Sequence, residues 1–150
     1  MANWVIDENI FEIASNPADS RFQSAMYFTE TIYRFHKLVL DHEGILISKY
    51  RKFFDNSKLI NSWFKKMVRS AGHIEHRSSK LSNRISSDLD NLKFDPDDKC
   101  FVGVALNADR VITSEDGDFY KEEVCLYFIT QLLLEVLKIE ESISKESTKR

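Results

Sequence analysis

The chain has 150 residues, of which 43% are hydrophobic and 30% are charged, values that are ordinary for globular proteins. This length suits one domain with a substantial core. With only four glycines and two prolines, the chain does not have the composition of a disordered protein. It also lacks a signal-peptide core and any apolar run long enough to cross a bilayer, so we expect a cytoplasmic protein with no membrane partner.

Charge is distributed unevenly along the chain, although the net charge is only −3. The segment 49–84 holds ten Lys and Arg residues against two acids, a net charge of +8, which leaves −11 for the rest of the chain. Acids are concentrated in 88–123, where there are eleven of them and four basic residues. A basic surface beside an acidic pocket is typical of a metal-dependent enzyme that acts on a polyanion.

Short apolar runs alternate with segments of helical periodicity. The apolar runs predict strands at 4–6, 38–40 and 110–113. The periodic segments predict helices at 17–37, 45–54, 59–70, 78–92, 95–106 and 119–127. Residues 132–139 fit either a strand or a continuing helix, and we favour an edge strand. The first predicted helix is expected to be capped at Asp19 and Ser20.

Alternating strands and helices predict the α/β class, here a small parallel-sheet, three-layer sandwich. We expect one domain over 1–143, followed by a frayed polar tail at 144–150. Functional groups of such sheets collect beyond the carboxyl ends of the strands. Two of the predicted strands run directly into acids there, the first at Asp7 and the third at 115–118.

Three groups of acids are candidates for a metal site. They are Asp7, the cluster Asp95, Asp97 and Asp98, and the run Glu115, Asp116 and Asp118. Carboxylates gathered without cysteine suit Mg²⁺ or Mn²⁺, and a cation would relieve their mutual repulsion. The alternative is structural: the second group could cap a helix, and the third could be a solvated turn.

Three segments, in order, resemble the metal-binding segments of PIN-domain proteins. They are Val5–Phe11, Asp98–Leu106 and Val111–Phe119, and together they span most of the chain. The first resembles a strand that delivers an Asp, with an Asn two residues later. The second resembles an Asp followed by an apolar helix rich in small residues, and the third a strand that ends in Ser/Thr-x-Asp-x-Asp-Phe.

The resemblance implies a PIN-like fold and a Mg²⁺- or Mn²⁺-dependent endoribonuclease that cleaves single-stranded RNA. Many PIN-domain proteins are toxins held by an antitoxin, and many act as dimers, so a regulatory protein and a homodimer are expected partners. Asp7, Asp98 and Asp116 would be the catalytic metal ligands, with Asp118 also at the metal. Asn9 would orient Asp7 or the substrate.

One position departs from the family pattern. PIN domains usually carry a further Glu on the helix after the second strand, and Lys49 stands where that Glu is expected. A lysine removes a ligand and adds positive charge beside the ions. The alternative function is therefore a catalytically depleted PIN-like module that binds RNA or a protein partner.

A second candidate site is the basic segment 49–84. Lys65, Lys66 and Arg69 lie on roughly one face of a predicted helix, and together with Lys49 they are expected to bind RNA phosphates. Trp63 and Phe64 lie beside these cations and could stack on bases, although aromatic residues at helical spacing more often pack in a core. The charges could equally solvate a helix face.

The remaining reactive side chains carry no recognisable motif. His73 and His76 lack the order of a zinc-protease motif, and a surface turn is expected at 72–76. Cys100 and Cys125 lie in apolar surroundings and are expected to be buried, reduced thiols.

Overall fold

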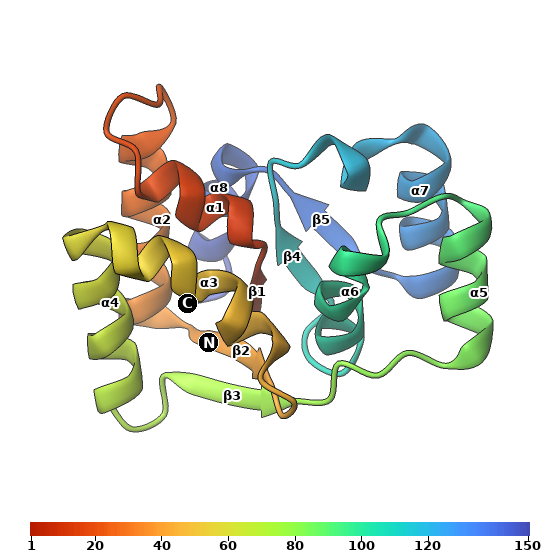
Figure 1. Cartoon of the computed structure of the whole chain (residues 1–150), viewed down its shortest axis with the longest axis horizontal. Coiled ribbons are helices and arrows are strands. Elements are labelled where there is room, and N and C mark those ends of the chain that lie inside the picture. The colour runs from red at the N-terminus through yellow and green to blue at the C-terminus, as the bar shows by residue number, and fades with distance from the viewer.

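The computed structural model describes all residues, 1–150, and contains a parallel sheet of five strands (Figure 1). The strands are β1 (Asn3–Ile6), β2 (Lys37–Asp41), β3 (Ile74–Arg77), β4 (Val111–Thr113) and β5 (Glu135–Leu137). Their order in the sheet is β3-β2-β1-β4-β5, and every neighbouring pair is parallel. The expected α/β class is confirmed.

Eight α-helices surround the sheet and give three layers. They are α1 (Glu8–Ala14), α2 (Phe22–Phe35), α3 (Ile45–Asn56), α4 (Lys58–Arg69), α5 (Asn83–Asn91), α6 (Lys99–Leu106), α7 (Glu122–Tyr127) and α8 (Ile139–Ser147). Helix α6 packs against β1, β2 and β4, and α3 lies beside it. Helices α2 and α8 pack together behind the sheet in the view of Figure 1. None of the helices is both long enough and apolar enough to span a bilayer.

The strand order places a topological switch between β1 and β4. The chain moves outward from β1 through β2 to β3, and then returns to place β4 on the other side of β1. Ile6 pairs with Thr113 at the ends of these two strands, and the backbone N–H of Asp7 donates to the Thr113 carbonyl at 2.9 Å. In open parallel sheets, a crevice for ligands forms at such a switch, outside the carboxyl ends of the strands.

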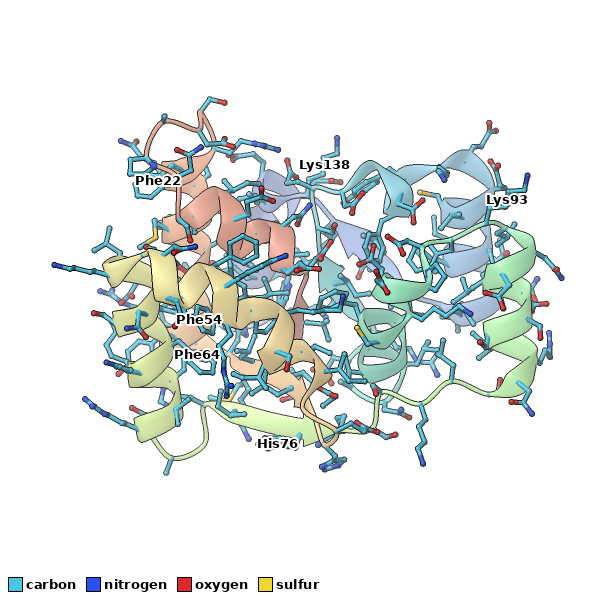
Figure 2. The ribbon with its side chains drawn as sticks, viewed as in Figure 1. Phe22, Phe54, Phe64, His76, Lys93 and Lys138 are labelled. Atoms are coloured by element: carbon cyan, nitrogen blue, oxygen red, sulfur yellow. The ribbon has the colours of Figure 1, made fainter.

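The central strands are apolar because helices cover both of their faces. Trp4, Val5 and Ile6 of β1 are all fully buried within one continuous hydrophobic core. Phe54 of α3 and Phe64 of α4 stack with their ring centroids 4.3 Å apart, which fixes the angle between these helices (Figure 2).

Most of the elements predicted from the sequence are present. The predicted strands at 4–6, 38–40 and 110–113 match β1, β2 and β4, and the segment 132–139 contains the edge strand β5. The predicted helices also form, but those predicted at 17–37 and 78–92 begin only at Phe22 and Asn83, and the segments at 95–106 and 119–127 each begin with a 3₁₀ turn.

Three local expectations were wrong. The chain turns directly into helix α1 after β1, a helix that was not predicted. The expected turn at 72–76 contains the start of edge strand β3 instead. The N-cap of α2 is Arg21; the Asp19 carboxylate accepts the Arg21 N–H and pairs with its guanidinium rather than capping the helix.

The C-terminal segment was also predicted wrongly, because α8 continues to Ser147 and buries a charged residue. Glu146 is 1% exposed and accepts from Nε2 of the buried His36 at 3.1 Å. The Ala2 N–H donates to Nδ1 of the same imidazole, so Nε2 must carry the proton. Arg150 pairs with the other Glu146 oxygen at 2.8 Å. Most of the segment 144–150 is therefore held in the fold rather than frayed.

Candidate metal centre

Three carboxylates from two elements meet at the switch point. Asp7 follows β1, Glu8 begins α1, and Asp98 ends the 3₁₀ turn Pro96–Asp98 that leads into α6. Each offers one oxygen, and these oxygens all lie within 4.8 Å of one another. Asp7 is 1% exposed and Asp98 5% exposed, so two of the three carboxyl groups have little contact with water.

Local hydrogen bonds fix Asp7 relative to the end of β4. The Ser114 hydroxyl donates to Asp7 Oδ2 at 2.6 Å, and the same hydroxyl oxygen accepts the Asp116 N–H at 3.0 Å. Ser114 itself is fully buried. One serine therefore connects the acid after β1 to the acid after β4.

Asp98 is positioned by its backbone rather than by its side chain. Asp95 starts the 3₁₀ turn by accepting the Asp97 N–H at 3.0 Å, and Pro96 occupies the next position. The Asp98 N–H donates to the Asp95 carbonyl, while the Asp98 carboxylate accepts no hydrogen bond from the protein. Its oxygens thus remain available for a ligand.

Both buried carboxyl groups are harder to ionise than an ordinary aspartate. Burial raises the pKa of Asp7 from 3.8 to about 7; the Ser114 hydrogen bond opposes this rise, and the nearby Asp116 and Glu8 add to it. Burial, followed by the charge of Asp7, raises the pKa of Asp98 to about 7 as well. A divalent cation would stabilise the ionised forms of both groups.

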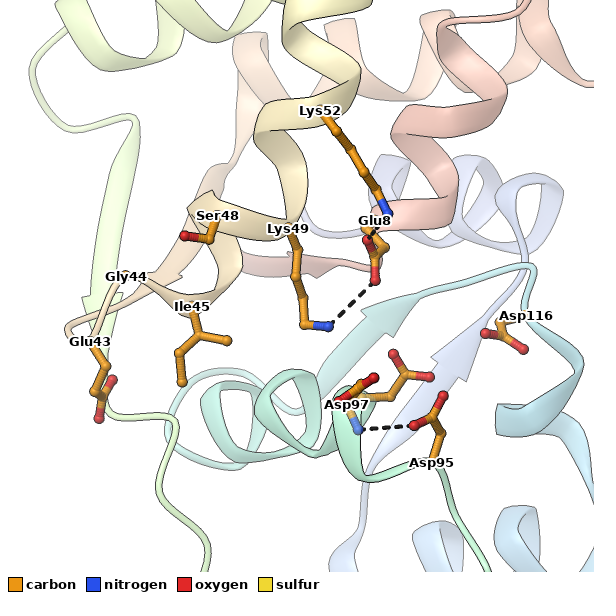
Figure 3. Close-up of a pocket in the computed structure, with 11 residues that line it drawn as sticks. Glu8, Glu43, Gly44, Ile45, Ser48, Lys49, Lys52, Asp95, Asp97 and Asp116 are labelled. Atoms are coloured by element: carbon orange, nitrogen blue, oxygen red, sulfur yellow. Dashed lines mark hydrogen bonds and ion pairs between the residues drawn. The ribbon is translucent and has the colours of Figure 1, made fainter.

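A polar cavity of about 640 Å³ opens over these carboxylates (Figure 3). Its lining is dominated by charged side chains, six acidic and two basic. The lining residues are Glu8, Glu43, Gly44, Ile45, Ser48, Lys49, Lys52, Asp95, Asp97, Asp98 and Asp116. Asp7 lies beneath them. The cavity is large enough for part of a small charged substrate.

Two lysines of α3 point toward Glu8 across the cavity (Figure 3). Lys49 Nζ is 3.6 Å from Glu8 Oε1, and Lys52 Nζ is 3.2 Å from Glu8 Oε2. Partial burial opposes the charge of Lys49, but the surrounding carboxylates, Glu8 above all, raise its pKa above the ordinary value. The start of α3 is fixed by Asp41, whose buried carboxylate accepts two backbone N–H groups at 2.8 Å.

Asp116 and Asp118 were also predicted at the metal, but neither belongs to the group formed by Asp7, Glu8 and Asp98. Asp116 lines the cavity and caps the next 3₁₀ turn by accepting the Asp118 N–H at 2.9 Å. Asp118 does not line the cavity: it accepts the Asp95 N–H at 2.8 Å and pairs with Lys121 at 2.8 Å. Asp118 therefore supports the loop that carries Asp98.

The remaining predicted substrate-binding residues are also separated by the structure. Asn9 does not line the cavity, and its side-chain oxygen accepts the Glu115 N–H at 3.4 Å. This contact joins α1 to the loop after β4. The Asn9 side chain thus holds the loop after β4, and a hydrogen bond from the Asn9 backbone lowers the pKa of Asp7.

The cations of α4 lie away from the acidic cavity. Lys65 and Arg69 line a separate, mostly apolar groove of about 340 Å³ with Phe64. Lys66 points elsewhere, toward Glu30 at 3.5 Å. Trp63 packs in the core, as favoured from the sequence: it is 3% exposed, and its indole N–H donates to a buried carbonyl of α2.

Glu8, Lys52 and Ser114 contribute to the site but were not identified from the sequence. Glu8 had a visible signal, because an acid directly after a strand-ending Asp suits the first turn of a helix. Lys52 follows Lys49 by three residues, which places both on one face of α3. Ser114 is the Ser of the Ser/Thr-x-Asp-x-Asp-Phe pattern, but its role was not predicted, because its hydrogen bond to Asp7 spans 107 positions of sequence.

The donors present could hold a metal ion. All are carboxylate oxygens, two of the groups are buried, and neither Cys nor His is among them. Lys49 and Lys52 compete with a cation for Glu8, so Asp7 and Asp98 are the stronger candidates for ligands.

Comparisons with known proteins identify no relative of this chain: no family model, no curated protein and no solved structure matches it.

Proposed function

We propose that this chain is a PIN-like endoribonuclease that cleaves single-stranded RNA with Mg²⁺ or Mn²⁺ held by Asp7, Asp98 and Asp116. One observation carries the proposal: the buried carboxylates of Asp7 and Asp98 converge with Glu8 at the switch point of a parallel sheet, under an open polar cavity. The resemblance of three segments of the sequence to PIN-domain motifs supports the same chemistry.

The residues of the cavity would have different roles in RNA cleavage. A divalent ion held by the carboxylates would polarise a phosphate oxygen and lower the pKa of water. Ser114 holds Asp7 in place, and Asp95 sets the turn that presents Asp98. The lysines of α3 would attract the RNA backbone, because the cavity is otherwise acidic and would repel a polyanion.

The test is cleavage of an end-labelled single-stranded RNA by the purified chain in Mn²⁺, in Mg²⁺ and in EDTA. We expect cleavage with either metal, none in EDTA, and none by Asp98→Asn with metal present. Asp98 accepts no hydrogen bond from the protein, so the variant should fold normally. Glu123→Gln, at an exposed acid of α7, is the control. Full activity of Asp98→Asn would refute the proposal.

A second candidate function is the catalytically depleted module that binds RNA or a protein partner. Lys49 favours it, because its ammonium lies among the carboxylates, where an acid is expected in PIN domains. This reading predicts RNA binding that survives EDTA and no cleavage by folded, metal-loaded protein. Metal-dependent cleavage would exclude it.

The biological setting of the proposal follows from the resemblance alone. A cytoplasmic ribonuclease of the toxin type would need an antitoxin or another regulatory protein, and it could act as a homodimer. Expression of the chain in a bacterial host, with and without Asp98→Asn, tests the toxin role. Growth arrest by the unsubstituted chain only is the expected result.

A further inference from the structure

Lys49 and Lys52 share Glu8 but differ in their surroundings. The Lys49 side chain is 20% exposed, whereas the Lys52 side chain is 63% exposed. The Lys49 ammonium also lies 5.9 Å from the centroid of the Phe101 ring, which belongs to the helix that follows Asp98. Lys49 is therefore confined beside the carboxylates, while Lys52 stands at the rim.

The charge of the cavity indicates what Lys49 contributes to the site. Six acids and two lysines line the cavity, and Asp7 lies below them. One divalent ion would leave this environment negative, so a phosphodiester entering it needs further positive charge nearby. No third cation lines the cavity.

We propose that Lys49 is a catalytic residue whose ammonium contacts the scissile phosphate and supplies the charge that a second metal ion would otherwise supply. This inference rests on the proposed ribonuclease function. In the free protein Lys49 pairs with Glu8, and when phosphate binds Lys49, Lys52 continues to hold Glu8. The site is then complete with a single ion.

The reaction is hydrolysis, so water is the only co-reactant. A P–O bond forms to the water oxygen, and the P–O bond to the departing nucleotide oxygen breaks. The departing oxygen takes the electron pair, and one proton lost by water balances the proton that this oxygen gains from solvent. The Lys49 ammonium lowers the energy of the negative charge that develops on the phosphate oxygens, and it transfers no proton.

The experiment compares Lys49→Gln with Lys52→Gln, which removes a charge from the same helix and from the other ion pair of Glu8. Cleavage of single-stranded RNA gives kcat and KM, and titration with Mn²⁺, followed by electron paramagnetic resonance, gives the stoichiometry and Kd. For Lys49→Gln we expect kcat to fall about 100-fold, the loss typical of one charge-stabilising donor. Mn²⁺ should still bind as a single ion, with an unchanged or lower Kd, because a competing cation has been removed.

For Lys52→Gln we expect KM to rise, because this rim lysine helps to attract the RNA backbone, while kcat falls by less than about fivefold, the scale of an exposed ion pair. Equal losses of kcat in the two variants would overturn the proposal, as would a Lys49→Gln variant with normal kcat or with lost Mn²⁺ binding. Lys49→Glu provides a further test. A gain in cleavage together with a second bound Mn²⁺ would show a degraded two-ion site instead.

The role of Lys49 and the ribonuclease function can be refuted separately. If the unsubstituted chain cleaves RNA and Lys49→Gln cleaves it equally well, only the role of Lys49 is refuted. If the unsubstituted chain binds Mn²⁺ but leaves RNA intact, both the ribonuclease function and the catalytic role of Lys49 are refuted.

Discussion

Asp7→Asn tests how much the buried acidic site destabilises the metal-free protein. Burial raises the pKa of Asp7 from 3.8 to about 7, so between these pH values the folded chain binds more protons than the unfolded chain. The free energy of unfolding must therefore fall as pH rises from 3.8 to about 7. Above this range the loss of stability has reached its full size. The difference between the two pKa values corresponds to about 4 kcal/mol.

Asparagine removes this charge and can still accept the Ser114 hydrogen bond through its side-chain oxygen. Its buried NH₂ group would cost about 1–3 kcal/mol if unpaired, so the net gain at pH 8 should be about 2 kcal/mol. For a chain of this size, that gain raises Tm by about 4–8 °C. At pH 5 the gain should largely disappear, because the Asp7 carboxyl is then mostly protonated in the folded chain.

The assay is urea denaturation in EDTA at pH 5 and pH 8, followed by circular dichroism, with Asp55→Asn as the control. An equal loss of stability between pH 5 and pH 8 in Asp7→Asn and in the unsubstituted chain would refute the reasoning. Saturating Mn²⁺ should reverse the order at pH 8, since a ligand at about 100 times its Kd stabilises the folded state by about 2.7 kcal/mol.

Three further predictions concern the basic groove, the packing of α6 and the C-terminal helix. Lys65→Gln and Arg69→Gln should each reduce the slope of log K for RNA binding against log salt concentration by about 0.7, measured by fluorescence anisotropy. Unchanged slopes would show that RNA does not bind in the groove. Gly103→Ala should cost about 3 kcal/mol in urea denaturation, because its Cβ would lie 1.9 Å from the Ser79 carbonyl oxygen; a normal midpoint would contradict the packing. Glu146→Gln should cost about 3 kcal/mol at pH 7, since it removes the buried carboxylate charge that pairs with the buried His36 and with Arg150. Although burial opposes ionisation, its Arg and His partners lower the pKa of this Glu below 4.5, so the loss should shrink as pH falls below that value; a loss independent of pH would contradict the ion pair.

The central sheet was predictable because its strands are buried on both faces. Runs such as 4–6 and 111–112 are apolar and buried, and this signal is visible in a short window. The edge strand β3 has only one neighbour and remains partly exposed, so its polar sequence resembles a turn. The end of α8 was missed for another reason: Glu146 looks solvated until its partner His36, 110 positions away, is known.

Some site residues could likewise be predicted from the local sequence, whereas the positions of others depend on tertiary contacts. The positions of Asp7 and Asp116 could be predicted because parallel strands end at one edge, and each residue follows a strand. Asp118 has the same local signal, but its side chain faces Lys121 and the Asp95 N–H, a choice made by tertiary contacts. The proximity of Lys49 to Glu8 likewise depends on how α3 packs against α1.

The two cysteines differ in a way that makes one of them a natural reporter. Cys100 is the second residue of α6, two positions after Asp98; it is 9% exposed, and burial raises its pKa to about 12. Cys125 is only half-buried. Thiol reagents attack the thiolate, so Cys125 should be modified first, and Cys100 only during transient opening of the start of α6. In a Cys125→Ser background, the alkylation rate of Cys100 would therefore report local opening of the loop that presents Asp98, with no added probe needed.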